Sequence, residues 1–209
     1  MREDLRDLSS LDDRALLELA RRGDDGAFLA LYRKRQGKLY RFAMQMSGSG
    51  SIAEDVIQEV FLALMREPDR YDPERGPLEA YLYGVARNHV LQRLGADRRY
   101  VPINDDECDP GESLDQVYDR DPHSDLARAE TIESVRRAIL SLPEHYREVV
   151  VLCDLHEMSY ADASAALGCA VGTVRSRLHR ARKMLLEKLR PAAEPEVGTD
   201  GVRSARCVV

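Results

Sequence analysis

The sequence predicts an all-α protein with two helical domains joined by a flexible acidic linker. Charged residues make up 33% of the 209 residues, aromatic residues only 6%, and there is no Trp, a composition typical of helices rather than of β-barrels. Apolar residues recur at helical spacing on both sides of a stretch that shows no periodicity. We therefore expect domains at residues 12–99 and 126–190, a linker at 100–125 and a disordered tail at 191–209.

The first domain is expected to contain helices at residues 11–22, 26–46, 53–66 and 78–94. Asp12 or Asp13 is a suitable N-cap for the first of them. The third has the strongest pattern, with one apolar stripe formed by Val56, Ile57, Val60, Phe61 and Leu64. Residues 47–51 (SGSGS) are expected to form a loop. Residues 67–77 contain three prolines and a glycine and are expected to form an irregular loop.

The second domain is expected to be a helix-turn-helix domain. One helix covers residues 126–142, and Pro143 suits the first turn of the next, which ends near Leu155. Ser159 has the features of an N-cap for a short helix, Gly168 those of a turn, and a long helix follows from about Ala170 to Arg190.

Charge is strongly segregated along the chain. The net charge is −6, but residues 104–125 carry nine acidic and one basic residue, a net −8. Residues 169–190 carry seven basic and one acidic residue, a net +6. The overall acidity therefore hides a basic helix.

The final helix carries the candidate DNA-reading residues. On a helical wheel, Val171, Val174, Leu178, Ala181 and Leu185 form the inner stripe. Hydroxyl and guanidinium groups near the start of such a helix suit base edges and phosphates in a major groove. These outer residues are Thr173, Ser176, Arg180 and Lys183, flanked by Arg175, Arg177 and His179. The alternative is an ordinary solvated basic face.

Two further surfaces are candidates for binding. The outer face of residues 53–66 places Leu62 among Asp55, Gln58, Glu59 and Arg66, which fits a protein docking surface or a charged face with one stray Leu. The loop at 67–77 and the following helix combine aromatic side chains with basic ones. Such a combination suits single-stranded nucleic acid, whose nucleobases stack on aromatic rings while its phosphates contact cations. These residues are Arg70, Tyr71, Arg75, Tyr81, Tyr83, Arg87, Asn88, Arg93, Arg98 and Arg99, although Tyr81 could be partly core. His89 is expected to be a packing residue.

No catalytic constellation is evident. The segment starting at His156 lacks the second His of an H-E-x-x-H motif, and there is no glycine-rich phosphate loop. No cofactor and no metal are expected, because Cys108, Cys153, Cys169 and Cys207 are widely spaced and reduced thiols explain them. Without a membrane span or an apolar signal segment, the protein is expected in the cytoplasm.

Three of these segments resemble the extracytoplasmic-function (ECF) sigma factors of the sigma-70 family. They are AEDVIQEVFLAL (53–64), RYDPERGPLEAYLYGVARN (70–88) and the run from 142 to 182, which contains TVRSRLHRAR. The likeness covers roughly residues 24–189. Tyr81 stands where the family usually has Trp, and Ala170 where it often has Pro or Ser.

The resemblance implies a transcription initiation factor with no enzymatic activity. Asp55, Gln58, Glu59 and Leu62 would grip the β′ clamp helices of core RNA polymerase. Residues 126–190, which correspond to region 4 of the family, would contact the β flap. They would read the minus-thirty-five element of promoter DNA through Thr173, Arg175, Ser176, Arg177, His179, Arg180 and Lys183. The minus-ten element would be read through Arg70, Tyr71, Tyr81, Arg87, Asn88, Arg93, Arg98 and Arg99.

The resemblance also implies an anti-sigma factor as a partner, and a linker that occupies the basic cleft of polymerase as a mimic of RNA. Two other functions stay open: a stand-alone helix-turn-helix repressor or response-regulator output domain, and a helical adaptor that binds only proteins. DNA binding that depends on core polymerase would separate the three.

Overall fold

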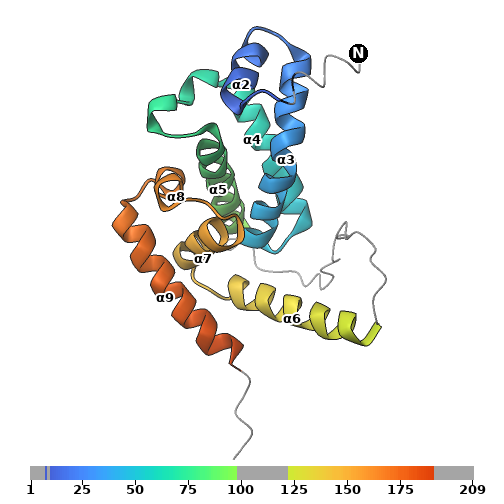
Figure 1. Cartoon of the computed structure of the whole chain (residues 1–209), viewed down its shortest axis with the longest axis vertical. Helices are drawn as coiled ribbons and strands as arrows, with labels where there is room; N and C mark the ends of the chain where they lie inside the picture. Colours follow the sequence, from blue (N-terminus) through green and yellow to red (C-terminus); the bar gives the residue numbers. More distant parts are fainter. Residues whose placement is uncertain (1–7, 9, 98–121, 191–209) are drawn as a thin grey trace, which may run out of the picture.

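The computed structural model describes residues 8, 10–97 and 122–190, which are helical and contain no β-strand (Figure 1). The first helical unit, the N-terminal unit, comprises α2 (Asp13–Arg21), α3 (Asp25–Ser47), α4 (Gly50–Arg66) and α5 (Leu78–Asp97). The C-terminal unit comprises α6 (Pro122–Leu140), α7 (Glu144–Val150), α8 (Tyr160–Leu167) and α9 (Val171–Leu189). The predicted all-α class is confirmed. The linker and the tail lie outside the described residues, except that residues 122–125 belong to α6.

Short polar side chains determine where several helices begin. Asp12 Oδ1 accepts a hydrogen bond from Ala15 N at 2.7 Å, and Asp24 Oδ1 accepts one from Ala27 N at 3.0 Å. Ser159 Oγ accepts one from Asp162 N at 3.1 Å. Each bond satisfies a backbone donor that the first helical turn leaves without a partner. Asp12 is therefore the cap of α2, and the predicted cap at Ser159 is confirmed.

The connection between α3 and α4 is shorter than predicted. The five-residue loop expected at 47–51 reduces to Gly48 and Ser49. Gly48 takes a left-handed conformation, φ 74°, that costs glycine little. Ser49 caps α4, so Gly50 and Ser51 enter its first turn despite their loop-like composition.

The segment between α4 and α5 is irregular, as predicted, but includes two short 3-10 helices, Pro68–Arg70 and Pro73–Arg75. Each begins with a proline, whose fixed φ suits a first helical position. In the C-terminal unit, α7 continues as a π-helical turn, Val151–Leu155, so the helical path ends where the sequence predicted.

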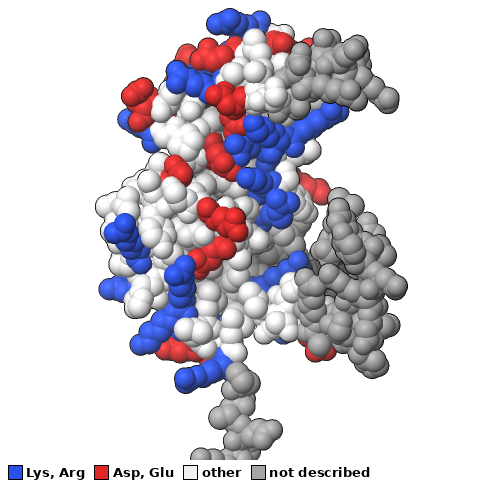
Figure 2. Space-filling model, viewed as in Figure 1, with Lys and Arg blue, Asp and Glu red and all other residues white. Residues whose placement is uncertain are grey.

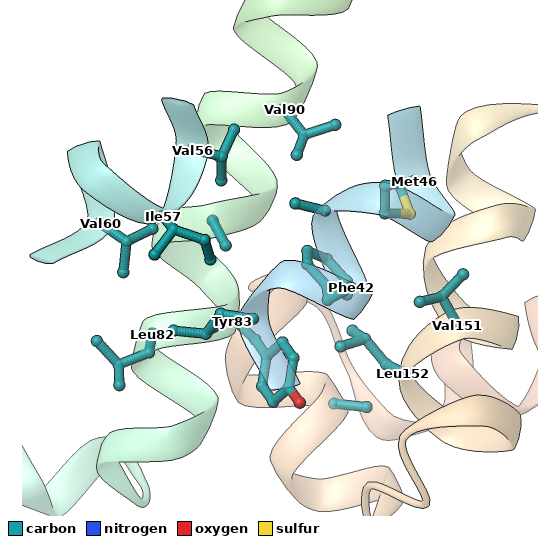
Figure 3. Close-up of a cluster of buried hydrophobic side chains, with 14 of the residues drawn as sticks. Phe42, Met46, Val56, Ile57, Val60, Leu82, Tyr83, Val90, Val151 and Leu152 are labelled. Atoms are coloured by element: carbon teal, nitrogen blue, oxygen red, sulfur yellow. The ribbon is translucent and has the colours of Figure 1, made fainter. Parts of the chain in front are cut away.

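Each unit has a hydrophobic core, and the two cores are continuous with each other. In the N-terminal unit, Leu16, Leu31, Ile57 and Val60 are buried between the four helices. Buried side chains of α7 and α9 form the core of the C-terminal unit, among them Val149, Val174 and Leu178. Figure 3 shows Phe42 and Met46 of α3 beside Val151 and Leu152, which joins the two cores.

The two units also touch along their helices. Helix α5 packs against α8, and α3 packs against α6, α7 and the π-helical turn. No pattern in the sequence predicted this contact, because apolar residues such as Phe42 and Leu152 would fit the core of their own unit equally well.

Candidate nucleic-acid interface

Helices α8 and α9 form the expected helix-turn-helix. Gly168 makes the turn in a left-handed conformation, φ 62°. Ser164 Oγ donates a hydrogen bond to Cys169 O at 2.5 Å, which ties the end of α8 to the turn. Val174, Leu178 and Ala181 are buried on the inner side of α9, which packs against α7 and α8. This packing fixes which face of α9 points outward.

The predicted DNA-reading residues share that outward face. Arg175, Ser176, His179, Arg180 and Lys183 are exposed, while Thr173 and Arg177 are half-buried. In Figure 2, lysine and arginine side chains follow the edge of the molecule where α9 runs in Figure 1.

The basic side chains of α9 differ in whether another side chain already binds them. Among the described residues, no carboxylate lies within salt-bridge distance of Arg180 or Lys183, so both are available to an anion. Arg182, the residue before Lys183, is bound by Asp154 through Nε–Oδ2 at 3.1 Å and Nη2–Oδ1 at 2.5 Å. The Arg175 guanidinium lies 5.7 Å above the ring of Tyr160, an arrangement that orients it at the start of α9.

The outer face of α4 is a partly apolar surface. Leu62 and Met65 are each 43% exposed, a large fraction for apolar side chains one helical turn apart. With Phe28, Gln58 and Phe61 they line a shallow depression of about 290 Å³. Met65 was missed by the sequence analysis, although its i+3 spacing from Leu62 was a usable signal.

The carboxylates predicted for this α4 surface lie beside it. Asp55 and Glu59 are half-buried, and Gln58 is exposed. Asp55 Oδ2 accepts a hydrogen bond from Arg93 Nη1 of α5 at 2.8 Å. A residue predicted to bind protein is thus paired with one predicted to bind DNA.

The aromatic residues predicted to stack on bases are largely covered. Tyr71 is only 8% exposed, its hydroxyl donates to Gly76 O at 3.3 Å, and its ring centroid lies 5.6 Å from that of Tyr81. Tyr81 is half-buried against the core, as the sequence suggested. Tyr83 is 2% exposed, so its ring is unavailable for stacking. Burial raises the pKa of Tyr71 and Tyr81.

Three arginines predicted at the minus-ten face are paired with carboxylates. Arg70 Nε lies 2.7 Å from Glu67 Oε2, and Arg93 is bound to Asp55. Arg87 Nε donates to Glu148 Oε1 of the C-terminal unit at 2.6 Å. Asn88 is exposed and accepts a bond from Arg87 Nη1 at 3.2 Å. Arg98 and Arg99 lie outside the described residues.

A polar junction between the units was not foreseen. His156 Nδ1 lies 2.8 Å from the Tyr83 hydroxyl, and His156 Nε2 lies 2.9 Å from Gln45 Oε1. With Gln45 Oε1 as acceptor, Nε2 donates and Nδ1 accepts from Tyr83, so a neutral imidazole satisfies both contacts. Burial, assisted by the nearby charges of Arg41 and Lys38, lowers the pKa of His156 to about 4.

Among the described residues, no group of three or more His, Cys, Asp or Glu side chains could hold a metal ion. Cys153 and Cys169 are free thiols, and burial next to Asp154 raises the pKa of Cys153 to about 11. In that same part of the chain, no helix combines the length and apolarity needed to cross a membrane.

The fold and its basic α9 face define a helical DNA-binding protein with a helix-turn-helix. Comparison with known proteins identifies the class further: residues 31–100 match the Sigma-70 region 2 family, and residues 132–185 match Sigma-70, region 4. The chain is 33% identical to the ECF RNA polymerase sigma-E factor of Escherichia coli K12, over 87% of this chain and 96% of that protein. It is 35% identical to the ECF RNA polymerase sigma factor SigE of Mycolicibacterium smegmatis, over 76% of this chain but only 60% of that longer protein.

Two solved structures of complexes also resemble this chain. CnrH in complex with the cytosolic domain of CnrY is 27% identical, with a TM-score of 0.61 over 84% of this chain and 95% of that one. The sigma factor RpoE in complex with the anti-sigma factor NepR from Bartonella quintana is 25% identical, with a TM-score of 0.54 over 74% and 91%. The chain belongs to the ECF sigma factors of the sigma-70 family, which are transcription initiation factors.

Proposed function

We propose that this sigma factor binds core RNA polymerase through the outer face of α4 and directs it to promoters that α9 and α5 read. The observation that carries the proposal is the outward face of α9, where Arg180 and Lys183 are exposed and have no carboxylate partner among the described residues. Such a face, held by a capped α8 and a glycine turn, fits the phosphates and base edges of a major groove.

The α4 surface supports the polymerase half of the proposal. Exposed Leu62 and Met65 with the neighbouring depression offer an apolar anchor. The half-buried Asp55 and Glu59 add carboxylates on the same helix, of which Asp55 is paired with Arg93. Contact with the β′ clamp helices and the β flap is carried over from the family. Because both solved relatives named above are complexes with CnrY or with the anti-sigma factor NepR, we also propose an anti-sigma partner for this chain.

The α9 assignment is tested by run-off transcription with core polymerase on genomic fragments. Arg180→Ala should weaken promoter binding by about 1–3 kcal/mol and relax one position if Arg180 reads a base, or weaken all sequences alike if it holds a phosphate. Arg182→Ala is the matched control, because Asp154 already engages that guanidinium. Equal effects of the two substitutions would contradict the assignment of α9.

The α4 assignment is tested separately by co-purification with core polymerase. Asp55→Arg with Glu59→Arg, and independently Leu62→Ser, should abolish co-purification while helicity stays intact. Glu54→Ala, at an exposed position on the same helix that does not line the depression, should bind normally. DNA binding by the chain without any polymerase would instead favour the stand-alone repressor function.

A further inference from the structure

Arg175 and Arg182 lie on the same side of α9 but have different partners. They are seven residues apart, close to two helical turns, and we call the side that carries them the α8 flank. Asp154 binds Arg182 through two hydrogen bonds and neutralises its charge. Among the described residues, no carboxylate lies within salt-bridge distance of Arg175, whose guanidinium carbon is 5.7 Å from the ring centroid of Tyr160. Because a ring attracts a cation without cancelling its charge, Arg175 is oriented and can still bind an anion.

Tyr160 is placed beside this flank by the start of α8. It is the first residue of that helix, and the capping hydroxyl of Ser159 fixes where the helix begins. The side chain is 37% exposed, so its ring contributes little to the hydrophobic core. The pKa of Arg182 is raised, chiefly by its hydrogen bond with Asp154 and to a smaller extent by Tyr160. Tyr160 is therefore close to both arginines of the α8 flank.

The α8 flank points away from the side of α9 that carries Arg180. At about 100° per residue, Arg175 and Arg180 are separated by about 140° around the helix axis, and Arg175 and Thr173 by about 160°. Arg180 and Thr173 are only about 20° apart by the same measure. A recognition helix in a major groove presents one side to the base edges, while side chains beside the groove meet the phosphate backbone. Arg175 is therefore directed toward a phosphate backbone when Arg180 faces the groove.

We propose that Tyr160 is a positioning residue for promoter binding: its ring holds Arg175 on the α8 flank, where the guanidinium binds a phosphate of the DNA backbone instead of a base edge. The inference rests on the proposed function and deepens it. Phosphate contacts fix the register and orientation of a protein on the duplex, whereas base contacts select the sequence. Tyr160 and Arg175 together thus set how α9 lies in the groove, and the outward face of α9 selects the sequence.

The contact with the ring helps because arginine is a flexible side chain. An exposed arginine loses conformational entropy when it is immobilised on a phosphate. The ring of Tyr160 restricts the guanidinium of Arg175 before DNA arrives, so less entropy remains to be lost on binding. A cation–π contact at an exposed site is strong enough to change an affinity by about two- to fivefold.

The test uses the full chain with core polymerase and a promoter fragment that the wild-type holoenzyme transcribes in a run-off assay. Tyr160→Leu keeps an apolar side chain but removes the ring, so the apparent Kd of the holoenzyme for this fragment should rise by about two- to fivefold. Tyr160→Phe keeps the ring and loses only the hydroxyl, so its Kd should equal that of wild type. Circular dichroism and co-purification with core polymerase check that each variant folds.

A double-mutant cycle separates positioning from a structural role. Arg175→Ala should weaken binding more than Tyr160→Leu does, and should reduce the salt dependence by about one phosphate contact. With Arg175 already replaced by Ala, Tyr160→Leu should weaken binding no further. Arg182→Ala is the matched background, because Asp154 already engages that guanidinium; in it, Tyr160→Leu should still have its full effect. Single-base changes in the upstream element should leave the factors for Tyr160→Leu and Arg175→Ala unchanged.

Four results would overturn the proposal. They are an unchanged Kd for Tyr160→Leu, an equal loss for Tyr160→Phe, additive losses in the cycle with Arg175→Ala, and loss of discrimination at one base position in Arg175→Ala. The second would give the Tyr160 hydroxyl a DNA contact of its own, and the last would make Arg175 a base-reading residue. If the wild-type holoenzyme transcribes no genomic fragment, the proposed function itself fails, and the positioning role fails with it.

Discussion

Arg87 and Glu148 show how a residue predicted for DNA binding serves the fold as well. Arg87 is 26% exposed, whereas Glu148 is 1% exposed and is the only buried charged residue among those the structure describes. The two partners are therefore unequal: an unpaired Arg87 can still reach water, but an unpaired Glu148 cannot.

The difference in exposure between Arg87 and Glu148 predicts different losses of stability when either side chain is replaced. Arg87→Ala leaves a buried carboxylate without a counter-charge and should lower the free energy of unfolding by about 3 kcal/mol. Glu148→Gln keeps a hydrogen-bond acceptor for Arg87 and should cost about 1 kcal/mol. The control is Arg93→Ala, also on α5, whose pair with Asp55 is nearly half-exposed and should contribute less than about 1 kcal/mol. Urea denaturation measures the free energy of unfolding of each variant. Equal losses for Arg87→Ala and Arg93→Ala would refute the argument that the Arg87–Glu148 pair is stabilising because it is buried.

His156 gives a pH-dependent prediction at the same interface. Its pKa is lowered to about 4 by burial and by Arg41 and Lys38, against the opposing charge of Glu79, whereas an unfolded His titrates near 6.5. The unfolded chain thus binds the proton more readily. The stabilising contribution of the neutral imidazole is complete above pH 6.5 and declines as the pH falls towards 4.

Comparison with His156→Gln isolates this effect from the carboxylates that titrate in the same range. Wild type should be more stable than the variant at pH 7.5, and the difference in free energy of unfolding should narrow at pH 5.5 and again at pH 4.5. Urea titrations at the three pH values measure it. A difference that stays constant from pH 7.5 to 4.5 would show that His156 does not titrate in this way.

At the scale of elements, α8 and α9 begin differently. Ser159 caps α8 with its hydroxyl, but Ala170 occupies the cap position of α9 with φ −63° and ψ 146° and has no side chain to accept a bond. The backbone there already has the extended conformation of an N-cap.

Ala170→Ser should therefore stabilise the protein by about 1 kcal/mol, because the new hydroxyl can accept a bond from a backbone N–H in the first turn of α9. Ser159→Ala should lose a similar amount at α8. Thermal and urea denaturation of both variants give the two values. If Ala170→Ser brought no gain while Ser159→Ala brought the expected loss, the first turn of α9 would already be satisfied in another way.

The elements themselves were largely predictable, since they depend on local signals. The stripe from Val56 to Leu64, the cap at Ser159 and the glycine at 168 each act within a few residues, and the structure confirms them. The loop at 47–51 was predicted too long, because Ser and Gly favour loops and caps equally. The capping hydroxyl of Ser49 decided between them.

The candidate sites were predictable only on helix faces. A helical wheel predicts that Arg180 is exposed and Leu178 is buried, and the structure confirms both. It cannot show that Tyr71 folds back onto Gly76, or that Arg87 meets a carboxylate 61 positions away. Those facts depend on tertiary contacts between segments that no local period relates.

At the scale of the whole molecule, the continuous core determines how the chain unfolds. Phe42 packs edge-on against both Tyr83, at 5.2 Å, and His156, at 6.0 Å, so one aromatic cluster belongs to both units. Separating the units would expose these rings and break the Arg87–Glu148 pair. The units should therefore lose their structure together rather than in sequence.

We expect wild type to unfold in one transition by differential scanning calorimetry, with equal calorimetric and van't Hoff enthalpies. Gly84→Val should uncouple the units and give two transitions, because its side chain removes the contact with Ala166 while leaving the interior of each unit unchanged. Gly95→Val, whose added side chain has open space around it, should keep the single transition at a slightly higher temperature, since valine has a higher helix propensity than glycine at an exposed helical site. Two separate transitions in the wild type would mean that the aromatic cluster and the ion pair are too weak to couple the units, and the two helical units would then be thermodynamically independent.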